Sequence, residues 1–72
     1  MLRIIVKIKE NREELKISLR ELERRTGIER HYLAELEKLP ADEILLSEAV
    51  FIAEALGVRI EDLFVVKKLE LI

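Results

Sequence analysis

The sequence predicts a mainly α-helical, compact domain of four to five short helices, in which an N-terminal and a C-terminal β-strand pair antiparallel. Three observations support this fold class. The 72 residues are 50% hydrophobic and 39% charged, with only two Gly and one Pro, a composition typical of an ordered, helix-rich protein. Hydrophobic residues recur at helical spacing through the middle of the chain and at every second position near its start. A chain of this length is expected to form one domain, residues 1–72.

The N-terminal strand is expected over residues 2–8. Hydrophobic residues occupy every second position there, beginning at Leu2 and ending at Ile8, and β-branched residues with this period are typical of a half-exposed strand. A short, charged helix is expected to follow over about 9–16. Because a lone strand leaves its edge groups unpaired, a closing strand over residues 64–71 is expected to pair with the first.

Two further short helices are expected over residues 19–26 and 30–37. Ser18 opens the first of them as a capping box with Glu21, in which each side chain accepts the backbone N–H of the other residue. Gly27 ends this helix, because Gly adopts the left-handed conformation at the lowest cost. Two short helices joined by a tight turn that contains Gly form a helix-turn-helix arrangement.

The second half of the chain is expected to begin with an irregular connection after Pro40 and to continue as a helix over residues 47–56. Ser47 is the expected N-cap of this helix, and Gly57 is the expected stop. Residues 60–63 are expected to add one further helical turn before the closing strand.

Charge is distributed unevenly along the chain. The formal net charge is −2, but residues 1–26 carry eight Lys and Arg against five Asp and Glu, which gives +3. Residues 27–62 carry three against nine, which gives −6, and residues 63–72 give +1. A basic N-terminal part and an acidic central part indicate a molecule with two electrostatically different faces. A solvated, charged surface is the alternative interpretation.

Several classes of function lack the side chains that they need. Without Cys and with a single His, the chain offers no disulfide, thiolate zinc site or histidine metal cluster, and no cofactor or small-molecule ligand is expected. An enzyme is not expected either, because neither Ser18 nor Ser47 has a credible base to activate it. No hydrophobic run is long enough to span a membrane and the start is unlike a signal peptide, so we expect a cytoplasmic protein.

Short motifs occur in a defined order between Arg12 and Leu63. They are Leu15, Ile17-Ser18, Glu21-Leu22, Thr26-Gly27-Ile28, Tyr32-Leu33, Leu36-Glu37, Ile52-Ala53-Glu54-Ala55-Leu56-Gly57-Val58 and Glu61-Asp62-Leu63. This order resembles the phage Cro/repressor-type (XRE-like) helix-turn-helix family. The resemblance implies a DNA-binding domain whose second helix rests on the DNA backbone and whose third helix enters the major groove.

The resemblance assigns DNA contacts to the second and third helices. The positions that touch base edges are Arg30, His31 and Glu35. Those that touch phosphates are Lys16, Ser18, Arg20 and Arg24. Two alternatives stay open: His31 is an exposed helix residue without a DNA contact, and the arginines of the second helix pair with nearby glutamates. Those glutamates are Glu21, Glu23 and Glu29.

The resemblance also implies a partly buried ion pair between Arg12 of the first helix and Glu37 at the end of the third. Such a pair fixes the geometry of the third helix more reliably than it adds stability.

Four departures from the family pattern accompany these matches. Leu19 stands where the family commonly has Gln, Lys16 where it has Gly or Asn, and Glu29 where a Ser or Thr caps the third helix. The connection 38–46 is acidic where the family has a basic, Gly-containing loop.

Two functions from different classes are therefore considered. The first is a sequence-specific transcriptional regulator that binds double-stranded DNA as a homodimer. The alternative is a protein-interaction module, antitoxin-like or an adaptor, that keeps the fold with weak or no DNA binding; Leu19 and the acidic residues between 29 and 54 support it.

The dimer contact is expected on the terminal strands, residues 2–8 and 64–72. One helical core cannot cover both faces of a two-stranded sheet, and exposed hydrophobic patches usually mark interfaces. The residues expected at this interface are Ile4, Ile5, Val65, Leu69 and Leu71.

Overall fold

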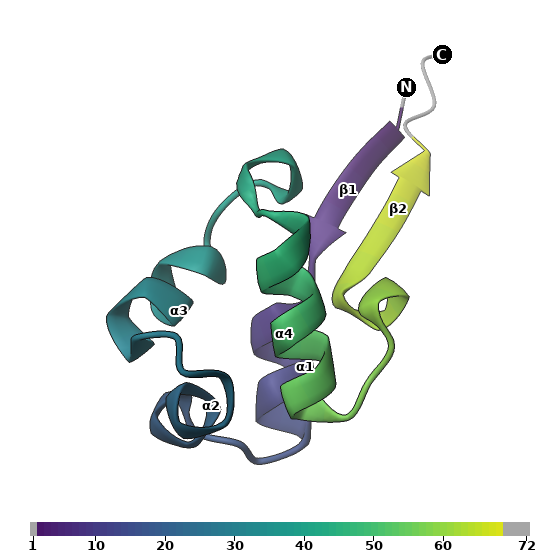
Figure 1. Ribbon diagram of the computed structural model, residues 1–72. Coiled ribbons are helices and arrows are strands. Elements are labelled where there is room, and N and C mark those ends of the chain that lie inside the picture. The colour runs from purple at the N-terminus through teal and green to yellow at the C-terminus, as the bar shows by residue number, and fades with distance from the viewer. Residues whose placement is uncertain (1, 69–72) are drawn as a thin grey trace.

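The computed structural model describes residues 2–68, which form four α-helices, two 3-10 turns and two β-strands (Figure 1). The strands are β1 (Leu2–Val6) and β2 (Phe64–Lys68). The helices are α1 (Ile8–Glu14), α2 (Leu19–Thr26), α3 (Arg30–Leu36) and α4 (Leu46–Leu56). The 3-10 turns are η1 (Ala41–Glu43) and η2 (Ile60–Leu63). The mainly α-helical fold class with antiparallel terminal strands is confirmed.

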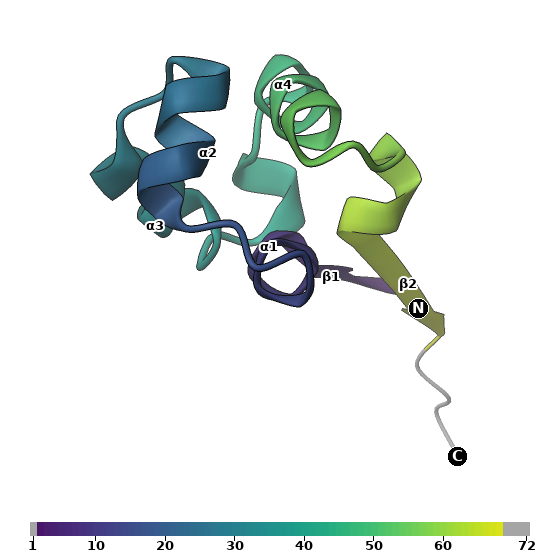
Figure 2. The ribbon, with the colours of Figure 1, turned by 90° about the horizontal axis from the view of Figure 1, so that it is seen from below.

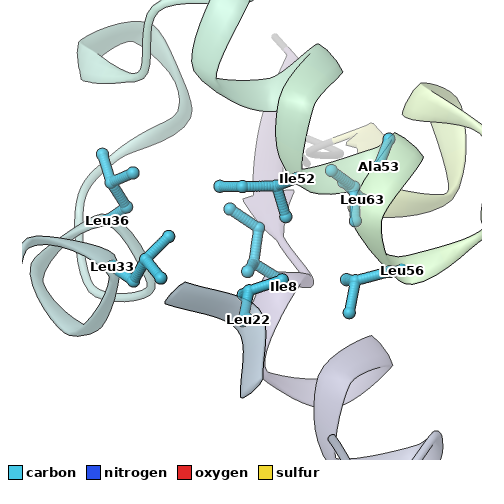
Figure 3. Packing of buried hydrophobic residues seen from close by; sticks show 8 residues of the cluster. All are labelled: Ile8, Leu22, Leu33, Leu36, Ile52, Ala53, Leu56 and Leu63. Atoms are coloured by element: carbon cyan, nitrogen blue, oxygen red, sulfur yellow. The ribbon is translucent and has the colours of Figure 1, made fainter. Parts of the chain in front are cut away.

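One cluster of buried side chains joins all four helices and η2 (Figure 3). Helices of seven to eleven residues are too short to be stable alone, so this packing is what stabilises them. Leu33 and Leu36 face inward from α3. The cluster consists of Ile8, Leu22, Leu33, Leu36, Ile52, Ala53, Leu56 and Leu63.

The boundary between the first strand and the first helix differs from the sequence prediction. β1 ends at Val6, and Ile8 begins α1 as a side chain only 1% exposed. The alternating pattern placed Ile8 on a strand, but the Lys7 N–H donates to the Leu63 carbonyl at 2.7 Å, which ties the start of α1 to η2. Asn11 reinforces this contact, since its amide donates to the carbonyls of Lys7 and Asp62, each at 2.8 Å.

The strands pair antiparallel with Ile5 opposite Val65, and the pair extends away from the helices (Figures 1 and 2). The face opposite that of Ile5 and Val65 is the more exposed one, with Leu2 at 67%, Ile4 at 51% and Val66 at 60% exposure. The far end of the sheet extends beyond the helices and is exposed, whereas Val6 and Phe64 at its near end pack against the core. The expected interface residues Leu69 and Leu71 lie outside the described residues.

The N-cap of the last helix lies two residues before the expected one, Ser47. α4 starts at Leu46, so Ser47 lies inside its first turn and Leu45 takes the N-cap position. A leucine side chain cannot accept a hydrogen bond, and the carboxylate of Glu48 instead accepts the Leu45 N–H at 3.0 Å. Gly57 ends the helix with a φ of 71°, as the sequence predicted. The preceding connection contains the 3-10 turn η1.

Lys16, between α1 and α2, adopts the left-handed conformation with a φ of 58°. This conformation costs a residue with a Cβ about 1 kcal/mol or more in conformational energy, whereas Gly adopts it without that cost. We therefore expect Lys16→Gly to raise the free energy of unfolding by about 1 kcal/mol in urea denaturation. Glu54→Gly, at an exposed right-handed position of α4, should lower it by about as much. An equal loss in both variants would contradict the strain at Lys16.

Candidate nucleic-acid interface

A short turn sets the angle between α2 and α3. Gly27 ends α2 with a φ of 76°, and α3 begins three residues later. The Thr26 hydroxyl holds the turn from both sides, because it donates to the Leu22 carbonyl at 2.8 Å and accepts the Ile28 N–H at 3.0 Å. Ile28 packs against the core at the same point. These contacts fix the two helices relative to each other without a long loop.

Carboxylates occupy the N-terminus of α3. Glu29 is the N-cap and accepts the N–H groups of His31 and Tyr32 at 2.9 and 3.1 Å, which lowers the pKa of its carboxyl. Glu23 of α2 accepts the Arg30 N–H at 2.9 Å. Glu29 thus replaces the Ser or Thr of the family pattern as a working cap. These backbone N–H groups already donate to carboxylates. A nucleic acid would therefore contact the side chains of α3 rather than its N-terminus.

The three candidate base-reading residues lie toward solvent on α3. The His31 side chain is 84% exposed, and its Nδ1 lies 2.7 Å from a carboxylate oxygen of Glu29. Glu35, one helical turn later, is exposed, and Arg30 is half-buried. Leu33 points to the opposite side, into the core. One side of α3 therefore holds the helix in place while the other presents polar side chains.

The expected phosphate contacts lie around the start and the outer side of α2. Lys16 and Arg20 are exposed, and Ser18 caps the helix by accepting the Glu21 N–H at 3.0 Å. Only this half of the expected capping box forms. The Glu21 carboxylate binds Arg24 and Arg25 instead of returning to Ser18, because two guanidinium groups lie one turn further along.

Glu21 is the acceptor that these two arginines share. Arg24 Nε donates to it at 2.9 Å and Arg25 Nε at 2.9 Å, and Arg25 also reaches the Ala55 carbonyl of α4 at 2.9 Å. Hydrogen bonds from Arg24 and then Arg25 lower the pKa of Glu21 to about 2. Both arginines thus pair with Glu21, which is the alternative to a phosphate contact. The Arg24 side chain is 72% exposed, and exposed pairs contribute little stability, so a phosphate can replace Glu21 there.

Arg12 and Glu37 form the most buried ion pair among the described residues. Arg12 Nε donates to Glu37 Oε2 at 2.7 Å, and a second guanidinium nitrogen donates to Oε1 at 3.3 Å. The third nitrogen donates to the Ile17 carbonyl at 3.0 Å. The side chains are 12% and 6% exposed, and the hydrogen bond from Arg12 to Glu37 raises the pKa of Arg12. This arrangement joins the end of α3 to α1 and to the turn before α2.

One contact at the site escaped the sequence analysis. The Tyr32 hydroxyl donates to the Glu48 carboxylate, which raises the pKa of Tyr32 and joins α3 to α4. The two residues lie 16 positions apart, and no spacing rule links residues of different helices. Leu19, at the position where the family pattern has a DNA-contacting Gln, has a structural role because its side chain packs against the core.

No helix within residues 2–68 is long and hydrophobic enough to cross a membrane. Residues 7–68, from the N-cap of α1 to the end of β2, match a family model described as Cro/C1-type HTH DNA-binding domain. A search of curated proteins found no match.

Proposed function

The chain belongs to the Cro/C1-type helix-turn-helix DNA-binding domains, and from this premise we propose that it regulates transcription by binding a specific DNA sequence as a homodimer in the cytoplasm. The observation that carries the proposal is the two-sided α3. Leu33 and Leu36 anchor one side in the core, while Arg30, His31 and Glu35 occupy the other. A helix fixed in this way can enter a major groove without rearrangement.

Base recognition is assigned to α3. Arg30 is suited to a bidentate contact with guanine, because two of its guanidinium nitrogens match the spacing of O6 and N7. His31 donates to a base acceptor from its free ring nitrogen, and Glu35 accepts from a cytosine amine. Arg30 thus supplies most of the discrimination.

Phosphate contacts are assigned to the start of α2 and its outer side. Lys16, Ser18 and Arg20 lie before and within the first turn of α2, where a backbone phosphate approaches its N-terminus. Arg24 joins them when a phosphate replaces Glu21 as its acceptor. These contacts position the protein and carry no sequence information.

Two substitutions separate base reading from phosphate binding. Arg30→Ala should relax the base preference at one position of each half-site, a loss of about 1–3 kcal/mol of discrimination. Arg24→Ala should weaken binding to all sequences alike and reduce the salt slope by about one unit. Selection from a randomised duplex pool measures the first, and fluorescence anisotropy on random duplex at two salt concentrations measures the second. Arg59→Ala, in the turn before η2, is the matched control and should bind as the parent does. The assignment fails if both test variants also bind as the parent does.

The strand pair is proposed as the dimer contact. Leu2, Ile4 and Val66 form a hydrophobic surface on one face, and Ile5 faces Val65 on the other. In the described residues, β2 pairs with β1 alone, so its outer edge is open to the β2 strand of a second copy. A two-fold axis through this edge leaves both α3 helices free to enter successive major grooves, roughly 34 Å apart.

Sedimentation equilibrium tests this dimer. The parent should have twice the chain mass of 8.5 kDa, and the double variant Ile4→Lys/Val66→Lys should sediment as a monomer, because it replaces the exposed hydrophobic face of the strand pair with charged side chains. A parent that stays monomeric at high micromolar concentration would contradict the proposal. So would a dimer that survives deletion of residues 65–72 with unchanged affinity.

The protein-interaction module has its own supporting observations. Asp42 and Glu43 lie exposed on η1, which follows α3 in the chain, and Glu35 adds a third acid on the outer side of α3. Binding to random duplex with no dependence on salt, or no binding at all, would favour this function over DNA recognition.

A further inference from the structure

Large hydrophobic side chains are exposed on and just before α4, around the exposed Ser47. Leu46 and Val50, one turn apart, are 73% and 42% exposed, and Phe51 beside them is 54% exposed. Leu45, directly before the helix, is 63% exposed. We call these four side chains the α4 patch. The inward side of the same helix, which includes Ile52, is buried, so α4 is hydrophobic on both sides while only one side has a partner within residues 2–68.

The α4 patch is separate from the strand pair. Figure 2 shows α4 on the far side of the helices from α1, next to α2. A hollow between α2 and α4 continues the patch, and Phe51 forms part of its wall. The other lining residues are Arg25, Thr26, Glu54 and Ala55. Neighbouring large hydrophobic side chains in water, with an adjoining hollow, are typical of a surface that binds a partner.

The charge around the patch limits what can bind there. Residues 39–58 contain four acids and no Lys or Arg. Asp42 and Glu43 are exposed on η1, which precedes the patch in the chain, and Glu54 is exposed one turn beyond Val50. Glu48 lies on the same helix with its carboxylate hydrogen-bonded to Tyr32 and to the Leu45 N–H, and Arg25 is the base that lines the hollow. This acidic rim repels DNA and anionic lipid. It also opposes a two-fold contact between two α4 helices, because two acidic rims would then face each other.

We propose that the α4 patch binds an amphipathic helix of a second protein, one whose hydrophobic stripe is flanked by Lys and Arg. The stripe covers Leu46, Val50 and Phe51, with one large side chain in the hollow, and the flanking bases meet the acidic rim. α4 spans 11 residues, or about 16 Å, which matches a partner helix of about three turns. The proposal goes beyond DNA recognition and does not depend on it.

Matched synthetic peptides test the proposal. The probe is a fluorescein-labelled amphipathic helix of about four turns, with Leu on one side and Lys along both flanks. The control peptide has Glu in place of each Lys. In anisotropy titrations with the full chain and no DNA, the Lys peptide should bind at least about tenfold more tightly than the Glu peptide. Glu54→Lys should narrow this difference, because it removes one acid from the rim.

Substitutions in the patch should remove binding without unfolding the chain. Leu46→Ser and Phe51→Ser should each weaken the Lys peptide about tenfold or more, while the melting temperature stays within about 2 °C because both side chains are exposed. Ile4→Lys/Val66→Lys is the control and should bind the peptide as the parent does, since it changes the strand pair alone. DNA affinity should also stay unchanged in Phe51→Ser, which separates this proposal from DNA recognition.

Four results would overturn the proposal. Equal binding of both peptides would show that the acidic rim does not select the partner. No binding of either peptide would show that the patch does not bind an amphipathic helix. Unchanged affinity in Phe51→Ser would place the peptide elsewhere. Loss of the parent's dimer in Phe51→Ser would show that a second copy of this chain covers the patch.

Discussion

Glu37→Ala is expected to lower the free energy of unfolding by about 3–5 kcal/mol. The substitution leaves the Arg12 guanidinium only 12% exposed and without the carboxylate that accepts two of its hydrogen bonds. The Ile17 carbonyl remains as its single described acceptor. The penalty arises from this stranded charge, because little water can reach it, and not from the loss of the attraction alone.

Urea denaturation measures this effect, with two controls. Glu35→Ala removes an exposed acid from the same helix and should change the free energy of unfolding by less than about 0.5 kcal/mol. The double variant Arg12→Met/Glu37→Leu removes both charges and should recover much of the loss, because a buried pair adds little net stability over hydrophobic residues of similar size. If Glu37→Ala and Glu35→Ala destabilise equally, the pair is solvated rather than buried.

Local signals in the sequence predicted the helix-turn-helix segment well. α2 begins and ends where Ser18 and Gly27 placed it, since a cap and a left-handed stop act through their own backbone. The Arg12–Glu37 contact was implied only by the family resemblance. Its 25-residue separation gives no local pattern, so the composition and spacing of this chain alone could not have revealed it.

Signals that depend on tertiary contacts were misread or missed. Ser47 has the side chain of a cap, but the N-cap position is Leu45, two residues earlier, and the carboxylate of Glu48 accepts the Leu45 N–H. Glu21 has the position of a capping-box acid, yet two arginines compete for it. In both cases several local partners were available, and only the folded geometry selects among them.

Ile8 is the clearest example, because alternating hydrophobic residues run from Leu2 through Ile8 without a break in pattern. The chain leaves the strand after Val6, and Ile8 enters the core from α1, between Leu22 and Ile52 (Figure 3). The strand ends because burying Ile8 in the core, as the first residue of α1, is more favourable than continuing the strand. The pattern of residues 2–8 alone cannot predict this tertiary contact.

Ile8→Ala is therefore expected to lower the free energy of unfolding by about 3 kcal/mol, within the 2–5 kcal/mol typical of a buried Ile truncated to Ala. Ile4→Ala, the same change on the strand at 51% exposure, should cost less than about 1 kcal/mol. Urea denaturation at a concentration where sedimentation shows a monomer keeps dimer effects out of the comparison. A continuous strand over residues 2–8 would place both side chains on one face and make the two losses similar. A large loss in Ile8→Ala alone requires the helical start at Ile8, on which the position of α1, its Arg12 and the anchored end of α3 all depend.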